Sequence, residues 1–182
     1  MLMKIHSIIE GTRVNGPGFR FGVWVQGCLR NCPGCFNAEA CCMDGGRDVP
    51  VNELVRLAFR QQYDGISVSG GEPFYQDDEL ARLLEECRRY GMTTLVYTGY
   101  TYEELFAAGK HALWHCDYLI DGEYRREIPS RCRWAGSGNQ RFLRLQDGKL
   151  AADLTALQDN STDGEIFIGT DGTITITGFV EI

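Results

Sequence analysis

The stretch FRFGVWVQGCLRNCPGC, residues 19–35, decides the fold. Its first half is dense in aromatic and β-branched residues, which predicts a strand over residues 19–26. Its second half is a turn-rich loop that carries Cys28, Cys32 and Cys35. A buried strand that runs directly into a loop with reactive side chains is typical of α/β folds, whose functional loops follow the carboxyl ends of parallel strands.

Strands and helices are expected to alternate on the C-terminal side of this stretch. Apolar residues at helical spacing predict helices, and short β-branched runs predict strands. The expected strands are 3–9, 19–26, 66–69, 93–98 and 118–120, and the expected helices are 51–62, a second one around 80–87 and 102–108. Alternation of this kind predicts parallel βαβ units with right-handed crossovers. The units are too few for an eight-fold barrel of about 250 residues, so we expect an α/β fold built as a partial, open (βα)-type barrel of parallel strands.

The C-terminal segment has a different pattern. Residues 165–169 and 173–177 alternate as strands do, and residues 170–172, Thr-Asp-Gly, form a turn signal between them. We therefore expect a β-hairpin appendage, with one domain over residues 1–145 and a C-terminal extension over residues 146–182.

Composition narrows the class of protein. The 182 residues carry a net charge of −7 and eight cysteines. The acidic balance argues against broad binding to nucleic acid or to an anionic membrane. Cysteine is too sparse for a secreted disulfide scaffold, and neither a signal-peptide core nor an apolar run long enough to span a bilayer is visible. The sequence therefore predicts a cytoplasmic protein with a metal or redox site, and no nucleic-acid or membrane partner.

The three clustered cysteines are the first chemical motif. Soft thiolates at C-x3-C-x2-C spacing select zinc, copper(I) or an iron–sulfur cluster. Structural zinc takes four ligands and often shows two C-x2-C pairs, whereas here one triplet stands without a second pair. A fourth thiolate from Cys41 or Cys42 is conceivable. Three ligands on a four-iron cluster would instead leave one iron open, as a catalytic site requires.

The second motif is Ser-Gly-Gly-Glu-Pro at residues 69–73, directly after a short expected strand. Two glycines give a ligand close access to the backbone, and Glu72 supplies an acid that could meet an ammonium group. At the expected ends of later strands, Thr98 and Asp121 are candidates for contacts with a ribose or a methionyl group.

Together the two motifs resemble the radical S-adenosylmethionine (SAM) superfamily and, within it, the activases of anaerobic ribonucleoside-triphosphate reductase. The stretches that carry the resemblance are VQGC (25–28), NCPGCFN (31–37), VYTGY (96–100), IDG (120–122) and WAGSGNQR (134–141). The resemblance covers residues 3–145. The glycine before the third cysteine is common in this branch, whereas much of the superfamily has an aromatic residue there.

The resemblance implies a cofactor and a set of contacts. Cys28, Cys32 and Cys35 would hold a [4Fe-4S] cluster, and SAM would chelate the fourth iron. The implied or candidate SAM contacts are Gly34, Phe36, Asn37, Gly70, Gly71, Glu72, Thr98 and Asp121. Reductive cleavage of SAM would give a 5′-deoxyadenosyl radical, and this chemistry needs no general acid or base from the protein.

The resemblance also implies partners. The radical would be passed to a backbone glycine of a glycyl-radical enzyme such as anaerobic ribonucleotide reductase, and a low-potential donor such as flavodoxin or ferredoxin would supply the electron. Two alternatives are a radical SAM enzyme that acts directly on a small molecule or peptide, and a non-catalytic zinc or iron–sulfur module.

Other polar and sulfur-bearing residues have structural explanations. Residues 125–144 hold six arginines against one acid, which indicates a docking surface, an anion site or a solvated loop paired with neighbouring acids. Cys87 lies on an apolar helical stripe and is expected in the core, and Cys116 and Cys132 are expected to be structural.

Overall fold

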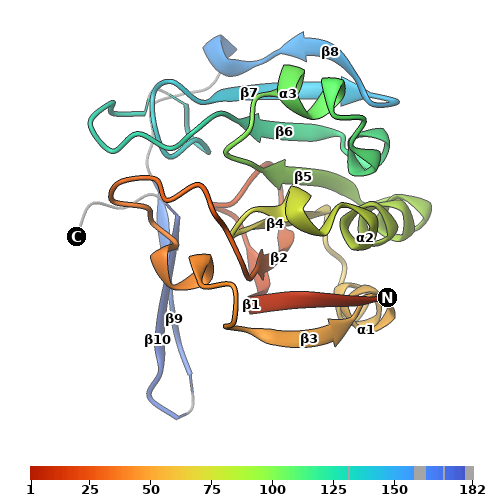
Figure 1. Cartoon of the computed structure of the whole chain (residues 1–182). Coiled ribbons are helices and arrows are strands. Elements are labelled where there is room, and N and C mark those ends of the chain that lie inside the picture. Colours follow the sequence, from red (N-terminus) through yellow and green to blue (C-terminus); the bar gives the residue numbers. More distant parts are fainter. Residues whose placement is uncertain (131, 158–162, 170, 179–182) are drawn as a thin grey trace.

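A mixed β-sheet forms the body of the computed structural model, which describes residues 1–130, 132–157, 163–169 and 171–178. Over these residues the sheet has eight strands in the order β3-β1-β2-β4-β5-β6-β7-β8 (Figure 1). The strands are β1 (Leu2–Thr12), β2 (Arg20–Val25), β3 (Arg47–Pro50), β4 (Gly65–Gly70), β5 (Thr93–Tyr97), β6 (Tyr118–Asp121), β7 (Arg141–Gln146) and β8 (Lys149–Asp153).

The four central strands are parallel, which confirms the expected α/β class. β2 pairs with β4, β4 with β5 and β5 with β6 in parallel register. The strands outside this core are antiparallel to their neighbours, which differs from the all-parallel expectation. Residues 13–19, between β1 and β2, are too few for a crossover, which needs a dozen or more residues. At the other edge, Asp147 and Gly148 have φ values of 49° and 73° and make the tight β7–β8 turn.

Three α-helices and four short 3-10 turns connect the strands within the described residues. They are α1 (Val51–Ala58), α2 (Asp77–Arg89), α3 (Tyr102–Ala107), η1 (Ala38–Cys41), η2 (Pro73–Gln76), η3 (His111–His115) and η4 (Thr155–Leu157). α1 ends four residues before the expected bound at 62, where polar residues 60–62 leave no apolar side chain to bury. A search of the described helices finds none with the length and apolar character needed to cross a bilayer.

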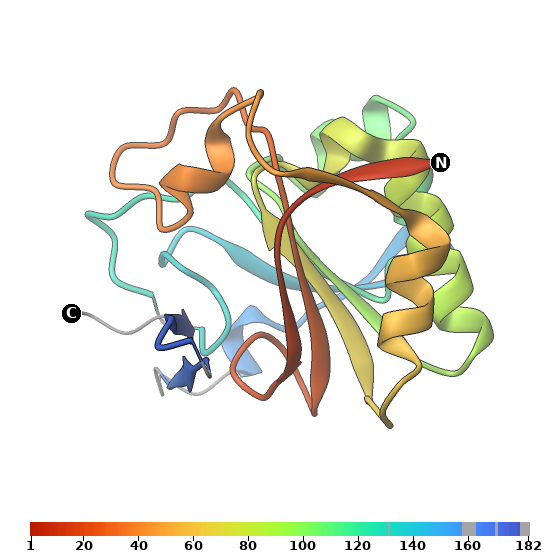
Figure 2. The ribbon, with the colours of Figure 1, turned by 90° about the horizontal axis from the view of Figure 1, so that it is seen from below.

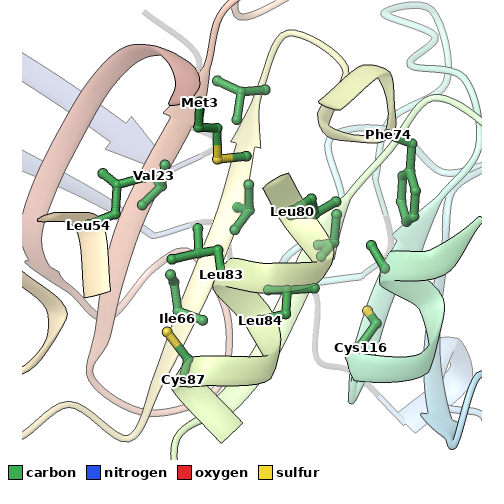
Figure 3. Close-up of a cluster of buried hydrophobic side chains, with 14 of the residues drawn as sticks. Met3, Val23, Leu54, Ile66, Phe74, Leu80, Leu83, Leu84, Cys87 and Cys116 are labelled. Carbon is green, nitrogen blue, oxygen red and sulfur yellow. The ribbon is translucent and has the colours of Figure 1, made fainter. Parts of the chain in front are cut away.

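The sheet has two unlike faces (Figure 2). α1 and α2 cover one face, whereas the cysteine-bearing loop and the C-terminal hairpin lie on the opposite side. Strand alternation explains this, because successive residues of a strand point to opposite faces. Val23 and Ile66 point toward the helices and pack with Leu54, Leu83 and Cys87 in the main core (Figure 3). Trp24, Ser69 and Tyr97 belong to the opposite, inner face.

The hairpin expected at the C-terminus is present as a separate two-stranded sheet, β9 (Gly164–Ile168) and β10 (Ile174–Gly178). Thr170 of the expected turn lies outside the described residues. The boundary expected between residues 145 and 146 falls inside β7, and the main sheet continues to Asp153. The division into two domains at that point stays a prediction.

Candidate functional site

A cavity of about 110 Å³ lies at the carboxyl ends of β2, β4 and β5. It collects side chains from loops that are far apart in the sequence, because the ends of neighbouring parallel strands meet at one edge of the sheet. Its lining includes Cys28, Arg30, Cys32, Cys35, Phe36, Asn37, Cys41, Ser69, Gly70, Gly71, Glu72, Tyr97, Thr98, Gly99, Tyr124, Gly136 and Gln140.

The cysteine loop is fixed at its base by backbone hydrogen bonds. Gly27 N donates to Ala40 O at 2.7 Å and Cys28 N donates to Cys41 O at 3.0 Å, so the chain after the loop returns beside its start. Within the loop, Gly34 has a φ of 70°, and a Cβ there would lie 2.8 Å from Arg126 Cδ. These contacts make the loop compact and place its three thiols on one side of the cavity.

The glycines of the second motif have a packing role in addition to lining the cavity. Gly71 N donates to Val25 O at 2.8 Å and Glu72 N donates to Gly27 O at 2.9 Å. A Cβ on Gly71 would lie 2.4 Å from Gly27 O, and one on Gly70 would lie 2.4 Å from Val25 O. The two glycines therefore let the β4 end lie directly against the start of the cysteine loop.

Glu72 is a buried acid that ties two strand ends together. It is 1% exposed. Its Oε1 accepts from Phe74 N at 3.1 Å and from Thr98 Oγ1 at 2.8 Å, and its Oε2 accepts from Gly99 N at 2.9 Å. Burial nevertheless raises its pKa above the ordinary value. A carboxylate can accept about four hydrogen bonds, so one acceptor position remains for a donor in the cavity.

Arg30 brings a positive charge to the same cavity. Its guanidinium lies 4.6 Å from the centroid of the Tyr100 ring, and a Cβ on Gly99 would lie 2.4 Å from Arg30 Nε. Nε is buried and has no hydrogen-bond partner among the described residues. Because a buried donor without an acceptor is costly, the cavity is chemically suited to a ligand with an anionic or carbonyl oxygen.

The thiols fit a cluster better than a single zinc ion. Burial raises the pKa of Cys28 and of Cys32 above the ordinary thiol value. No three of the sulfurs lie within 4.8 Å of one another in the described chain. Tetrahedral zinc with bonds of about 2.3 Å would hold its sulfurs about 3.8 Å apart. A larger centre, such as a four-iron cluster, suits the wider spacing.

Cys41 is a fourth thiol in this cavity. Its Sγ donates to Asn37 O at 3.6 Å. Its pKa is raised to about 12, first by burial and then by the nearby Cys35 and Cys28 thiols. Cys42 is exposed and does not line the cavity.

The structure brings most of the expected contact residues together. Six of the eight candidate SAM contacts line the cavity: Phe36, Asn37, Gly70, Gly71, Glu72 and Thr98. Gly34 and Asp121 do not. The Asp121 carboxylate faces away into a pairing with Arg141 and accepts from Tyr102 N at 2.7 Å. None of these assignments is tested by the geometry alone, and they stay predictions.

The loop that closes the cavity on the β6 side is built by the WAGSGNQR stretch. Gln140 Oε1 accepts from Gly136 N at 2.9 Å, and its Nε2 donates to Gly122 O at 2.8 Å. Asn139 Nδ2 donates to Glu123 O at 2.8 Å. These bonds hold Tyr124 beside Phe36, with 4.9 Å between the ring centroids.

Part of the arginine-rich stretch 125–144 is paired with acids. Arg133 lies 2.6 Å from Asp163, and Arg141 bridges Asp121 and Glu103. Arg131 lies outside the described residues. The solvated-loop interpretation therefore accounts for these two arginines.

Comparison with known proteins identifies a family and several relatives of this chain. Residues 14–143 match the family described as a 4Fe-4S single cluster domain. The chain is 32% identical to the anaerobic ribonucleoside-triphosphate reductase-activating protein of enterobacteria phage T4, over 74% of this chain and 90% of the relative. It is 32% identical to the protein of the same name from Escherichia coli K12, over 76% and 96% of the two chains. A pyruvate formate-lyase-activating enzyme from Clostridium pasteurianum is 33% identical over 67% of this chain but only 56% of its own length.

Proposed function

We propose that this chain, which belongs to the radical SAM family of glycyl-radical-enzyme activases, installs a glycyl radical on an anaerobic ribonucleoside-triphosphate reductase. The observation that carries the proposal is the single cavity in which three clustered thiols meet the Gly-Gly-Glu turn. The choice of partner is supported by the names of the phage T4 and E. coli relatives, which this chain covers over 90% and 96% of their length.

In this proposal Cys28, Cys32 and Cys35 hold the cluster. All three line the cavity from one loop, and the separation of their sulfurs supports a centre larger than a single ion. Cys41, which follows outside the C-x3-C-x2-C triplet, is not part of the proposed ligand set. Three thiolates leave one iron for an exchangeable ligand.

SAM is the proposed second occupant of the cavity. Its carboxylate matches the unused Nε of Arg30, and its ammonium group matches the acceptor position left on Glu72. Gly70, Gly71, Thr98, Phe36 and Asn37 form the rest of this contact set. When bound, the cluster and SAM supply an electron and a 5′-deoxyadenosyl radical that removes a hydrogen atom from the partner's glycine.

The chain's own residues have supporting tasks. Glu72 holds the ends of β4 and β5 at a fixed separation through Thr98 and Gly99, so the SAM contacts from both strands keep their positions. Tyr124 and Phe36, whose rings are in tilted contact, both line the cavity, and we propose that they limit the access of water. A low-potential flavodoxin or ferredoxin is the proposed electron donor.

The test is radical transfer to a defined partner. The anaerobically reconstituted and reduced protein is mixed with SAM and the anaerobic ribonucleotide reductase of the same organism, and electron paramagnetic resonance is recorded. A glycyl-radical doublet that depends on SAM and on Cys28 is expected. If deoxyadenosine instead forms rapidly with a small molecule or free peptide, and the reductase never gains a radical, the partner is wrong and direct action on that substrate replaces it.

A further inference from the structure

The C-terminal hairpin lies outside the matched stretch 14–143 and has an asymmetric surface. In the β9–β10 register, Ile174 lies opposite Ile168 and Ile176 lies opposite Ile166. Residues that face each other in an antiparallel pair share a face, so these four side chains form one isoleucine face. They are 63%, 75%, 44% and 67% exposed in the order named.

The base of the hairpin is fixed to the turn between β1 and β2. Asn15 Nδ2 donates to Thr177 Oγ1 at 2.7 Å, and Arg13 N donates to the Glu165 carboxylate at 3.1 Å. A Cβ on Gly178 would lie 2.3 Å from Asp163 O. The hairpin is therefore held in place at one end and runs crosswise to the strands of the main sheet (Figure 1).

A second cavity, of about 480 Å³, separates the hairpin from the inner face of the sheet. The sheet contributes Ile9, Trp24, Ser69 and Tyr97, and the hairpin contributes residues 174–178. All five consecutive β10 residues line this cavity, whereas no β9 residue does. Since side chains alternate between faces, a continuous run of lining residues means that the cavity follows the edge of β10.

That edge of β10 has unpaired backbone groups among the described residues, because the second sheet contains only β9 and β10. Gly169 N donates to Thr173 O at 2.7 Å, which makes this a hydrogen-bonded pair. Hydrogen-bonded and non-bonded pairs alternate in antiparallel ladders, so the N–H and C=O of Ile174 and Ile176 point away from β9. These groups point to the cavity side of β10.

The second cavity adjoins the cluster cavity. Phe36, Asn37, Ser69 and Tyr97 line both. Glu39 is the one acid among its lining residues, and no lysine or arginine is among them. Walls with so few charges suit an uncharged occupant, which would lie next to the thiol-bearing site.

We propose that the free edge of β10, with Ile174 and Ile176, is the docking strand for an extended, uncharged segment of the partner protein that carries the reacting glycine. This inference rests on the proposed function. An extended segment gains main-chain hydrogen bonds by adding to a sheet edge, and a glycine lets its backbone approach the reacting atoms closely. Because the two cavities adjoin, a segment on β10 would lie next to the place where the radical forms.

The test compares proline at two matched positions. Ile176→Pro removes an N–H that faces the cavity, whereas Ile168→Pro removes one that faces the opposite edge of the hairpin; neither position donates to the β9–β10 ladder. The readout is the ratio of partner glycyl radical to deoxyadenosine formed with the full-length reductase. We expect Ile176→Pro to lower this ratio about tenfold, the equivalent of about 1.4 kcal/mol, and Ile168→Pro to leave it at the wild-type value.

A second pair of variants, with aspartate in place of isoleucine, keeps the proposal testable if a proline variant fails to fold. Ile174→Asp places a second acid in a cavity that Glu39 also lines, whereas Ile168→Asp places one on the same face of the hairpin outside the cavity. Equal ratios for Ile174→Asp and Ile168→Asp would overturn the docking strand. A change from dimer to monomer in Ile174→Asp alone, measured by light scattering, would overturn it as well, because the edge would then join two copies of this chain. If the wild-type protein itself forms no reductase radical, the proposed function fails, and the docking strand fails with it.

Discussion

Thr98 Oγ1 donates a hydrogen bond of 2.8 Å to Glu72 Oε1 and so joins the end of β5 to the Gly-Gly-Glu turn after β4. Both residues are buried, at 4% and 1% exposure. Because a hydrogen bond to a charged group contributes about 1.5–3 kcal/mol, this contact is strong enough to set the width of the cavity between the two strands.

A double-mutant cycle measures that contact. Glu72→Gln and Thr98→Val should each lower the free energy of unfolding, and the double variant should lose about 1–3 kcal/mol less than the sum, because the shared bond is lost only once. Urea unfolding of the four proteins gives the coupling. The control cycle pairs Glu72→Gln with Thr94→Val, whose hydroxyl bonds His115 O instead, about 13 Å along β5. Coupling of equal size in both cycles would contradict a specific contact.

The burial of Glu72 also predicts a pH dependence. Its pKa is raised above the ordinary 4.5 chiefly by burial, against the hydrogen bonds from Gly99, Thr98 and Phe74. Between the unfolded and folded pKa values the folded state binds more protons, so the stability that Glu72 contributes is greatest below pH 4.5 and falls as pH rises through the folded-state pKa. The unfolding free energy of the wild type minus that of Glu72→Gln should therefore decrease with rising pH. A difference that is flat or grows with pH in urea titrations would exclude a raised pKa.

The sequence allowed the parallel core and the main site to be predicted because both depend on local patterns. The cysteine loop and the turn at 69–73 each follow a strand, and parallel strand ends meet regardless of side-chain detail. The side of the sheet on which Tyr97 lies could have been predicted by similar reasoning. Val96 next to it points toward the helices, so Tyr97 had to face the cavity side.

Other features depend on contacts between distant residues. Asp121 is the last residue of β6 and Thr98 directly follows β5, yet only the Asp121 carboxylate is bound by Arg141, 20 positions later. Arg30 gave no local signal, because its place in the cavity depends on Tyr100 and Gly99 from another loop. The antiparallel strands β7 and β8 were missed because they lie in a stretch dominated by charges, which masks the alternation of strand residues.

Substitution of Arg20, which does not line the cavity, is expected to lower the free energy of unfolding strongly. The side chain is fully buried, and its guanidinium donates to Ser67 Oγ, Pro17 O, Thr93 Oγ1, Ile66 O and Thr93 O, with no carboxylate among these partners. Arg20→Lys keeps a charge but cannot reproduce the planar set of donors, so we expect a loss of about 2–4 kcal/mol in urea unfolding. Arg82→Lys, on the exposed face of α2 beside Glu85, should change stability by less than about 0.5 kcal/mol. Equal effects at the two positions would mean that the buried bonds of Arg20 contribute nothing specific.

Alanine substitutions of the cysteines distinguish the proposed cluster ligands from the other thiols. Cys28→Ala, Cys32→Ala and Cys35→Ala should each abolish the absorbance near 400 nm and the content of about four irons per chain. Cys41→Ala removes a thiol from the same cavity and should retain the iron, because the three proposed ligands remain. Cys87→Ala, which is fully buried in the core, should retain the iron and lose only about 1 kcal/mol of stability. Loss of iron in Cys41→Ala would make that residue a ligand.

Arg30 gives a direct test of the SAM site. Its buried Nε has no partner among the described residues, and a carboxylate oxygen would satisfy it. A charge-assisted hydrogen bond of about 1.5–3 kcal/mol predicts that Arg30→Ala raises the Kd for SAM about ten- to a hundredfold, measured by anaerobic equilibrium dialysis on protein with a full iron content. Arg30→Lys should recover part of the affinity, since it restores the charge without the guanidinium geometry. Arg125→Ala, at an exposed arginine 4.0 Å from Glu123 and outside the cavity lining, is the control. A Kd within twofold of wild type for Arg30→Ala would remove Arg30 from the binding site and leave its buried nitrogen without a ligand.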